Sequence, residues 1–133
     1  MRLRRAALLL AVSAVLPACG QLYKGEGGEF HEACTLEARP SVRVTVVDTQ
    51  GNPRRDARVT YTRDGGPEQQ AECLRSEAGH CEWWLTEPEQ PGLFVLTATS
   101  ADGQRTVRQQ VTVTETEDKC HVLTETVRLT LPD

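Results

Sequence analysis

The sequence predicts an all-β fold, a single seven-stranded antiparallel β-sandwich over residues 41–133. From Ser41 onward, Val- and Thr-rich runs are separated at short intervals by Gly, Pro, Asn and Asp, as is typical of sandwiches and barrels. No segment shows the 3.6-residue apolar period of an amphipathic helix. A chain of 133 residues is long enough for one domain of this kind and hardly for two.

The expected strands cover residues 41–48, 57–63, 69–75, 81–86, 93–100, 105–114 and 120–131. The segments between them carry turn residues, because Gly and Asn permit a positive φ and Pro fixes φ. Four of the strands alternate apolar and polar residues, so that one face of each is expected in the core. The predicted core residues are Val42, Val44, Val46, Val59, Tyr61, Phe94, Leu96, Ala98, Val127, Leu129 and Leu131. The residues expected to face water are Arg43, Thr45, Thr60, Thr97, Thr99, Arg128 and Thr130.

Two parts of this pattern resemble a known family. Residues 42–53 are VRVTVVDTQGNP, followed by ARV at 57–59, and residues 91–98 are PGLFVLTA. They resemble the strand, Gly-x-Pro turn, Ala-x-Val strand and later Pro-Gly-x-Tyr-x-Val-x-Ala strand of carboxypeptidase regulatory-like domains. The resemblance spans about residues 42–113, and it departs where SADG at 100–103 replaces a Gly-Tyr pair. It implies a transthyretin-like sandwich and an accessory domain without catalytic residues, and an immunoglobulin-like Greek key is the alternative.

The first 18 residues have the composition of an export signal. Three arginines within the first five residues precede an apolar stretch of 11 residues at 6–16, and Ala18 is a small residue before a cleavage point. A short core helix is the alternative interpretation of such an apolar run. The position and the arginines favour a signal peptide over residues 1–18.

Residues 16–19, Leu-Pro-Ala-Cys, resemble the lipobox of bacterial lipoproteins. The resemblance implies that Cys19 carries acyl chains and anchors the protein to a membrane, whereas ordinary secretion would leave a free thiol. Gly20 after the cysteine is similar to the residue that accompanies outer-membrane sorting. Residues 19–40 are rich in Gly and Glu near their start and are expected to form the lipidated cysteine and a flexible tether.

Charge excludes two classes of partner. Removal of residues 1–18 takes away three arginines and no acidic residue, which leaves 12 basic and 19 acidic residues and a net charge of −7. An acidic domain is not expected to bind nucleic acid or anionic headgroups through its net charge. The chain also has no apolar run of 18 residues, so no transmembrane helix is expected.

With Cys19 assigned to lipid, four cysteines remain, and an exported chain is expected to oxidise them. Cys73 and Cys81 are expected to lie directly opposite each other in a hairpin centred on Glu77. By elimination Cys34 pairs with Cys120. The alternative is an envelope metal site, because His80 and His121 each adjoin a cysteine and acidic residues lie nearby. Neither pair has the spacing of a known zinc site.

Catalytic motifs are missing from the sequence: there is no Gly-x-Ser-x-Gly elbow and no His-Glu-x-x-His pair. His31, His80 and His121 are each expected at the surface or at a strand end, and the acidic residues Glu115, Glu117 and Asp118 are expected to be solvated. No catalytic residue, metal or cofactor is therefore expected.

Trp83 and Trp84 are the most conspicuous pair, because adjacent strand residues point to opposite faces. One indole is expected in the core and the other at the surface, where it either covers a neighbouring strand or anchors a protein or peptide partner. The sequence thus predicts a lipid-anchored, non-enzymatic envelope module with a structural or interaction role. The alternative function is that of a small metal-binding envelope protein.

Overall fold

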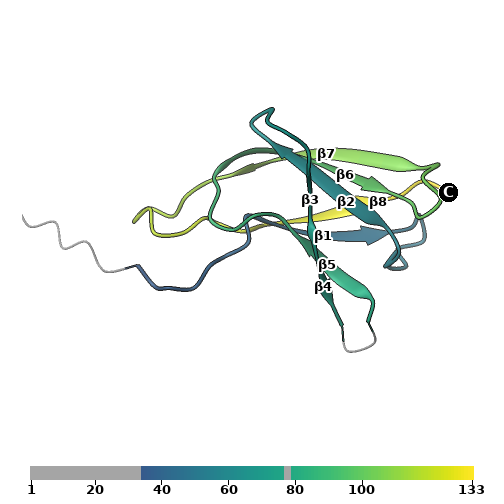
Figure 1. Cartoon of the computed structure of the whole chain (residues 1–133), viewed down its shortest axis with the longest axis horizontal. Coiled ribbons are helices and arrows are strands. Elements are labelled where there is room, and N and C mark those ends of the chain that lie inside the picture. The colour runs from purple at the N-terminus through teal and green to yellow at the C-terminus, as the bar shows by residue number, and fades with distance from the viewer. Residues whose placement is uncertain (1–33, 77–78) are drawn as a thin grey trace, which may run out of the picture. The chain divides into compact units, whose positions relative to one another are not determined.

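The computed structural model describes residues 34–76 and 79–133, which form eight β-strands and no helix (Figure 1). The strands are β1 (Val42–Val47), β2 (Arg58–Arg63), β3 (Gln69–Gln70), β4 (Glu72–Arg75), β5 (Cys81–Leu85), β6 (Gly92–Thr99), β7 (Thr106–Val113) and β8 (Glu125–Thr130). In these two ranges no helix is long and apolar enough to cross a bilayer. The predicted all-β fold is confirmed.

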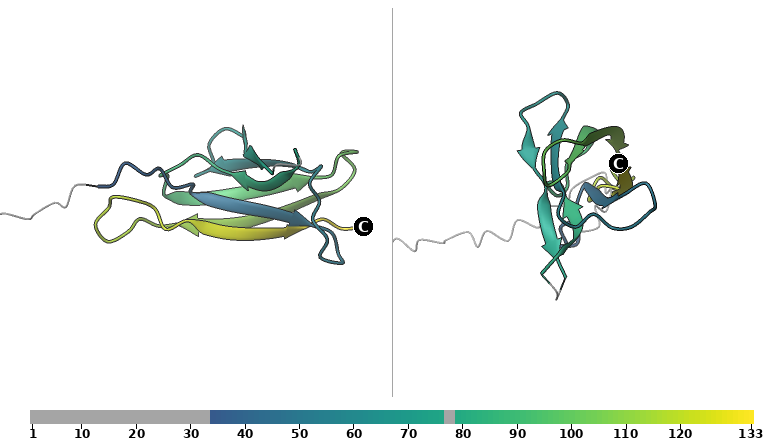
Figure 2. Two further views of the ribbon diagram at one scale, coloured as in Figure 1. Left: turned by 90° about the horizontal axis from the view of Figure 1, so that it is seen from below. Right: turned by 90° about the vertical axis from the view of Figure 1, so that its right-hand side faces the viewer.

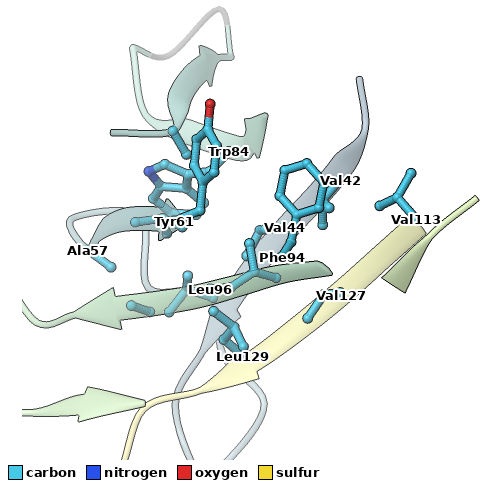
Figure 3. Close-up of a cluster of buried hydrophobic side chains, with 14 of the residues drawn as sticks. Val42, Val44, Ala57, Tyr61, Trp84, Phe94, Leu96, Val113, Val127 and Leu129 are labelled. Atoms are coloured by element: carbon cyan, nitrogen blue, oxygen red, sulfur yellow. The ribbon is translucent and has the colours of Figure 1, made fainter. Parts of the chain in front are cut away.

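The strands form two sheets of four, in the orders β4-β5-β1-β8 and β3-β2-β6-β7. Figure 2 shows the two sheets as separate layers, with the hairpin of β4 and β5 extending beyond the body. The apolar faces of both sheets meet in one core, where Trp84 and Val44 of the first sheet lie near Tyr61 and Phe94 of the second (Figure 3). Every predicted core residue is buried, with an exposed fraction of 4% or less. None of the residues expected to face water is buried.

The prediction that all strands are antiparallel is wrong. β1 and β8 pair in parallel over six positions, from Val42 opposite Glu125 to Val47 opposite Thr130. The alternation of apolar and polar residues shows which face of a strand is buried, and it is the same in parallel and antiparallel pairs. It therefore carries no information about the direction of the partner strand.

The predicted strand at 69–75 is two strands, which raises the count from seven to eight. β3 pairs with β2, whereas β4 pairs with β5 in the other sheet. Ala71 lies at the crossing: its backbone N–H donates to the Val59 carbonyl at 2.9 Å, and its side chain is 5% exposed. A small apolar residue thus lets the chain pass between the sheets without opening the core.

The predicted strand at 120–131 is shorter in the structure and begins at Glu125. Residues 120–124 belong to a loop, in which Val122 forms an isolated bridge with Glu115. Residues 34–40, expected to belong to the tether, are bonded to the domain through a disulfide at Cys34 and a bridge between Pro40 and Pro88. The predicted signal peptide, Cys19 and the predicted tether up to residue 33 lie outside the described residues.

Candidate functional site

The four cysteines form the two predicted disulfides. Cys34 is bonded to Cys120, with 5.2 Å between their Cα atoms, and Cys73 is bonded to Cys81, with 5.3 Å. The expectation that Cys73 and Cys81 lie directly opposite each other is wrong, because Cys73 pairs with Trp84 and Arg75 pairs with Cys81. A register shift between Leu74 and Arg75 adds a residue to β5, and the disulfide bridges the strands diagonally.

Trp83 and Trp84 occupy opposite faces of β5, as predicted. Trp84 is 3% exposed and belongs to the core cluster. Trp83 is half-buried on the outer face, where the Arg43 guanidinium carbon lies 5.2 Å from the centroid of its ring. Trp83 is therefore the indole available to a partner, and a cation–π contact of this kind fixes its orientation.

A groove of about 480 Å³ lies beside Trp83. Residues 81–84 of β5 form one wall, and residues 45–47 of β1 with Thr126 and Arg128 of β8 form another. The third wall is the loop between β1 and β2, which contributes Gly51, Pro53 and Arg55. Its volume is in the range of small-molecule binding sites.

The groove exists because β5 diverges from β1. The two strands pair at just two positions, Arg43 with Leu85 and Val44 with Trp84. Beyond them the β1–β2 loop takes the place of β5: Arg54 donates its backbone N–H to the Val46 carbonyl at 2.8 Å, and Pro53 bridges Val47. Residues 81–83 of β5 are thus left without a β1 partner.

The β1–β2 loop is held by its own hydrogen bonds. Asp48 accepts backbone N–H groups from Gln50 and Asn52, each at 2.9 Å. The Asn52 bond is the largest cause that lowers the pKa of the Asp48 carboxyl. Gly51 has a φ of +85°, a conformation that a glycine adopts without steric cost. The Asp-x-x-Gly-Asn-Pro turn predicted from the sequence therefore forms a preorganised wall of the groove.

Two arginines face the groove with their charges uncompensated. Neither Arg55 nor Arg128 forms an ion pair with a carboxylate of the described residues. Arg128 makes one weak contact, from Nη2 to the Gly51 carbonyl at 3.5 Å. Glu82 is the one acidic residue that lines the groove. A basic site therefore lies on a protein whose net charge is negative.

A second polar cluster surrounds His121, which is 9% exposed and not at the surface as expected. Its Nδ1 lies 2.8 Å from Glu89 Oε1, and its Nε2 lies 2.7 Å from Thr35 Oγ1. Because the carboxylate accepts, we assign the proton to Nδ1, and the neutral ring then accepts from the Thr35 hydroxyl. The hydrogen bond from His121 is the largest of the causes that lower the pKa of the Glu89 carboxyl.

Glu89 joins three parts of the domain. It also accepts the backbone N–H of Arg39 at 2.7 Å and that of Val122 at 3.0 Å. Its φ is +57°, an uncommon value for a residue with a side chain, and these bonds hold it in that conformation. The cluster fastens residues 34–40 and the loop before β8 to the loop before β6, beside the Cys34–Cys120 bridge.

The remaining predicted residues are not brought together. His80 is exposed near the turn of the β4–β5 hairpin, and His31 lies outside the described residues. No group of three or more His, Cys, Asp or Glu side chains that could hold a metal occurs within residues 34–76 and 79–133.

Asp118 accepts hydrogen bonds from the Thr116 hydroxyl and the Cys120 backbone N–H. The bond from Thr116 is the main cause of the lowered pKa of the Asp118 carboxyl.

Sequence reasoning singled out Trp83 but missed the residues around it. Arg55 lies between two expected strands, and Arg128 was expected to face water. Nothing in the sequence places these two residues together. Alternation did place Arg128 on the outer face of its strand, and that was the one available signal. No family model, curated protein or solved structure matches the chain.

Proposed function

We propose that the chain is an exported lipoprotein whose β-domain acts as a non-enzymatic interaction module of the cell envelope. Acyl chains on Cys19 attach it to the outer membrane, and the domain contacts its partner through the Trp83 groove. The observation that carries the proposal is this groove, which Trp83, in contact with Arg43, lines together with two arginines that form no ion pair with a carboxylate of the described residues. Trp and Arg are the residues most enriched at the centres of protein interfaces.

Export is supported by the cysteines and by the N-terminal sequence. Disulfides persist in oxidising compartments, and the two bridges use all four cysteines that follow the lipobox-like segment. Several acyl chains on one residue hold a protein to a bilayer far more firmly than a single chain does. Export and anchoring thus agree with the chemistry of all five cysteines.

The fold we propose is transthyretin-like, in keeping with the resemblance to carboxypeptidase regulatory-like domains. In the constant-type immunoglobulin arrangement the first two strands, A and B, share a sheet. Here β1 and β2 lie in different sheets, and β1 is paired with the last strand, β8. The strand order therefore favours the transthyretin-like alternative.

Anchoring is tested by replacing the acylated thiol. Cys19→Ser is expected to move the protein from the membrane fraction to the soluble fraction of a cell lysate, because a serine oxygen cannot accept the thioether-linked lipid. The fractions are washed with 1 M salt, since screening removes electrostatic adhesion and leaves acyl burial intact.

The matched control is Cys34→Ala/Cys120→Ala, which removes two disulfide-bonded cysteines and retains Cys19. This variant is expected to stay with the membranes. Retention of Cys19→Ser in the washed membranes would show that the lipoprotein assignment is wrong.

A further inference from the structure

We infer that the Trp83 groove binds an extended acidic peptide segment of a partner protein. This inference rests on the proposed interaction function and names the chemistry of the partner. Three features of the groove support it: uncompensated arginines, an open strand edge and an apolar surface beside that edge.

The arginines set the charge of the ligand. Arg55 and Arg128 line the groove, and Arg43 lies over the Trp83 ring. The one acidic residue that lines the groove is Glu82. The excess of cationic groups is local, because the chain as a whole is acidic. A guanidinium group pairs with carboxylates through two parallel hydrogen bonds, so these side chains favour Glu or Asp residues of a ligand.

The open edge of β5 favours an extended peptide. Residues 81–83 line the groove and have no partner on β1, because β1 pairs with β5 at Leu85 and Trp84 alone. A strand that lacks a neighbour on one side presents backbone donors and acceptors, which an added peptide strand can pair with. Figure 1 shows β4 and β5 projecting away from the rest of the sheet.

The apolar surface beside the edge accommodates alternate side chains of such a strand. Leu74 lies directly opposite Trp83 across the β4–β5 pair and is 49% exposed. An acidic polysaccharide is the competing ligand class, since sugars stack on open indole faces. The Arg43 guanidinium covers one face of the Trp83 ring, which favours the peptide.

The test titrates the purified full-length protein, in detergent micelles, with an acetylated and amidated peptide of five Glu-Val repeats. Binding is followed by tryptophan emission, and Trp83→Phe identifies the part of the signal that comes from the groove. Saturable binding is expected, at least about tenfold tighter than that of the matched Gln-Val peptide, and weakened by added salt. Arg55→Gln/Arg128→Gln is expected to weaken it about tenfold.

The matched control is Arg58→Gln/Arg108→Gln, which removes the same charge from two exposed arginines of the other sheet. It is expected to bind as the wild type does. Equal losses in the two double variants, equal binding of the Gln-Val peptide, or tighter binding of polygalacturonate would overturn the inference. If the Glu-Val peptide does not bind while a crosslinker at position 83 still captures a partner in membranes, the inference of an acidic peptide ligand is wrong and the proposed interaction role stands.

Discussion

At the scale of single residues, two adjacent tryptophans have opposite roles because a strand alternates its side chains between its faces. Trp84 fills the core between the sheets, whereas Trp83 packs against Arg43 on the outer face. Trp84→Ala is expected to lower the free energy of unfolding by about 3–5 kcal/mol, the usual cost of removing a buried tryptophan. Trp83→Ala is expected to cost about 1 kcal/mol, mostly through the lost cation–π contact.

Chemical denaturation of the two variants measures both costs. Trp84→Phe serves as a control, because it retains an apolar ring and is expected to lose less than Trp84→Ala. A loss for Trp83→Ala as large as that for Trp84→Ala would mean that Trp83 supports the fold and is not free to serve a partner.

Glu89 makes stability depend on pH. Its hydrogen bonds lower the pKa of its carboxyl in the folded protein below the ordinary value of 4.5. The stabilisation by this group is therefore complete above about pH 4.5 and is lost as the pH falls through the lower, folded pKa. Glu89→Gln is expected to be less stable than the wild type at pH 6, and the difference is expected to shrink below pH 4.5.

Urea unfolding between pH 3 and pH 6 measures this difference. Asp48, Asp102 and Asp118 also have lowered pKa values and contribute to the acid sensitivity of both proteins, so the comparison isolates Glu89. Glu37→Gln is the control, because the Glu37 side chain is exposed. A constant difference across the range would contradict the assigned hydrogen bonds.

The sequence predicted core residues better than it predicted the polar clusters. Period-2 alternation identifies Val44 and Leu96 as core residues from their near neighbours alone, because the face of a strand decides which side chains are buried. The His121–Glu89–Thr35 cluster depends on contacts between residues up to 86 positions apart, and none of the three carries a local signal. The placement of Arg55 and Arg128 at one groove also depends on contacts between distant residues, so it could not be predicted from the sequence.

At the scale of elements, the two disulfides close loops of very different length. The sequence separation is 86 residues for Cys34–Cys120 and 8 for Cys73–Cys81. In the chain-entropy model the longer loop constrains the unfolded state by about 2 kcal/mol more. Cys34→Ala/Cys120→Ala is therefore expected to lose more stability than Cys73→Ala/Cys81→Ala.

Chemical denaturation of the two double variants compares the losses, and intact mass shows whether the remaining pair is oxidised. Equal midpoints, or a larger loss for the hairpin pair, would contradict the loop-entropy argument. Peptide mapping that joined Cys34 to Cys73 or Cys81 would contradict the pairing itself.

Element boundaries and partners were predicted unevenly. The strands of β1, β2 and β6 follow from their alternation and from the turn residues beside them. The split into β3 and β4 depends on a change of sheet at Ala71, and the parallel pairing of β1 with β8 depends on tertiary contacts. The split and the parallel pairing do not change the pattern of apolar residues. They could therefore be seen only in the packing of the sheets.

At the scale of the whole domain, the entry of the chain and the groove lie towards opposite ends of β1. The chain enters through residues 34–40, which are fastened beside the start of β1, whereas the groove lies beside its end at residues 45–47. Figure 1 shows the first described residues and the C-terminus at opposite ends of the domain. If the protein is anchored at Cys19 as proposed, the groove lies at the end of β1 away from the residues through which the chain enters the domain.

Recognition through the Trp83 groove is tested by site-specific photocrosslinking in intact membranes. A photoreactive phenylalanine analogue replaces Trp83 in the full-length protein, and in a second strain it replaces Thr97, a half-buried residue on the outer face of the other sheet. We expect one discrete crosslinked species from position 83, reduced by Arg55→Gln/Arg128→Gln, and none from position 97. The same species from both positions, or none from position 83, would contradict recognition through the Trp83 groove.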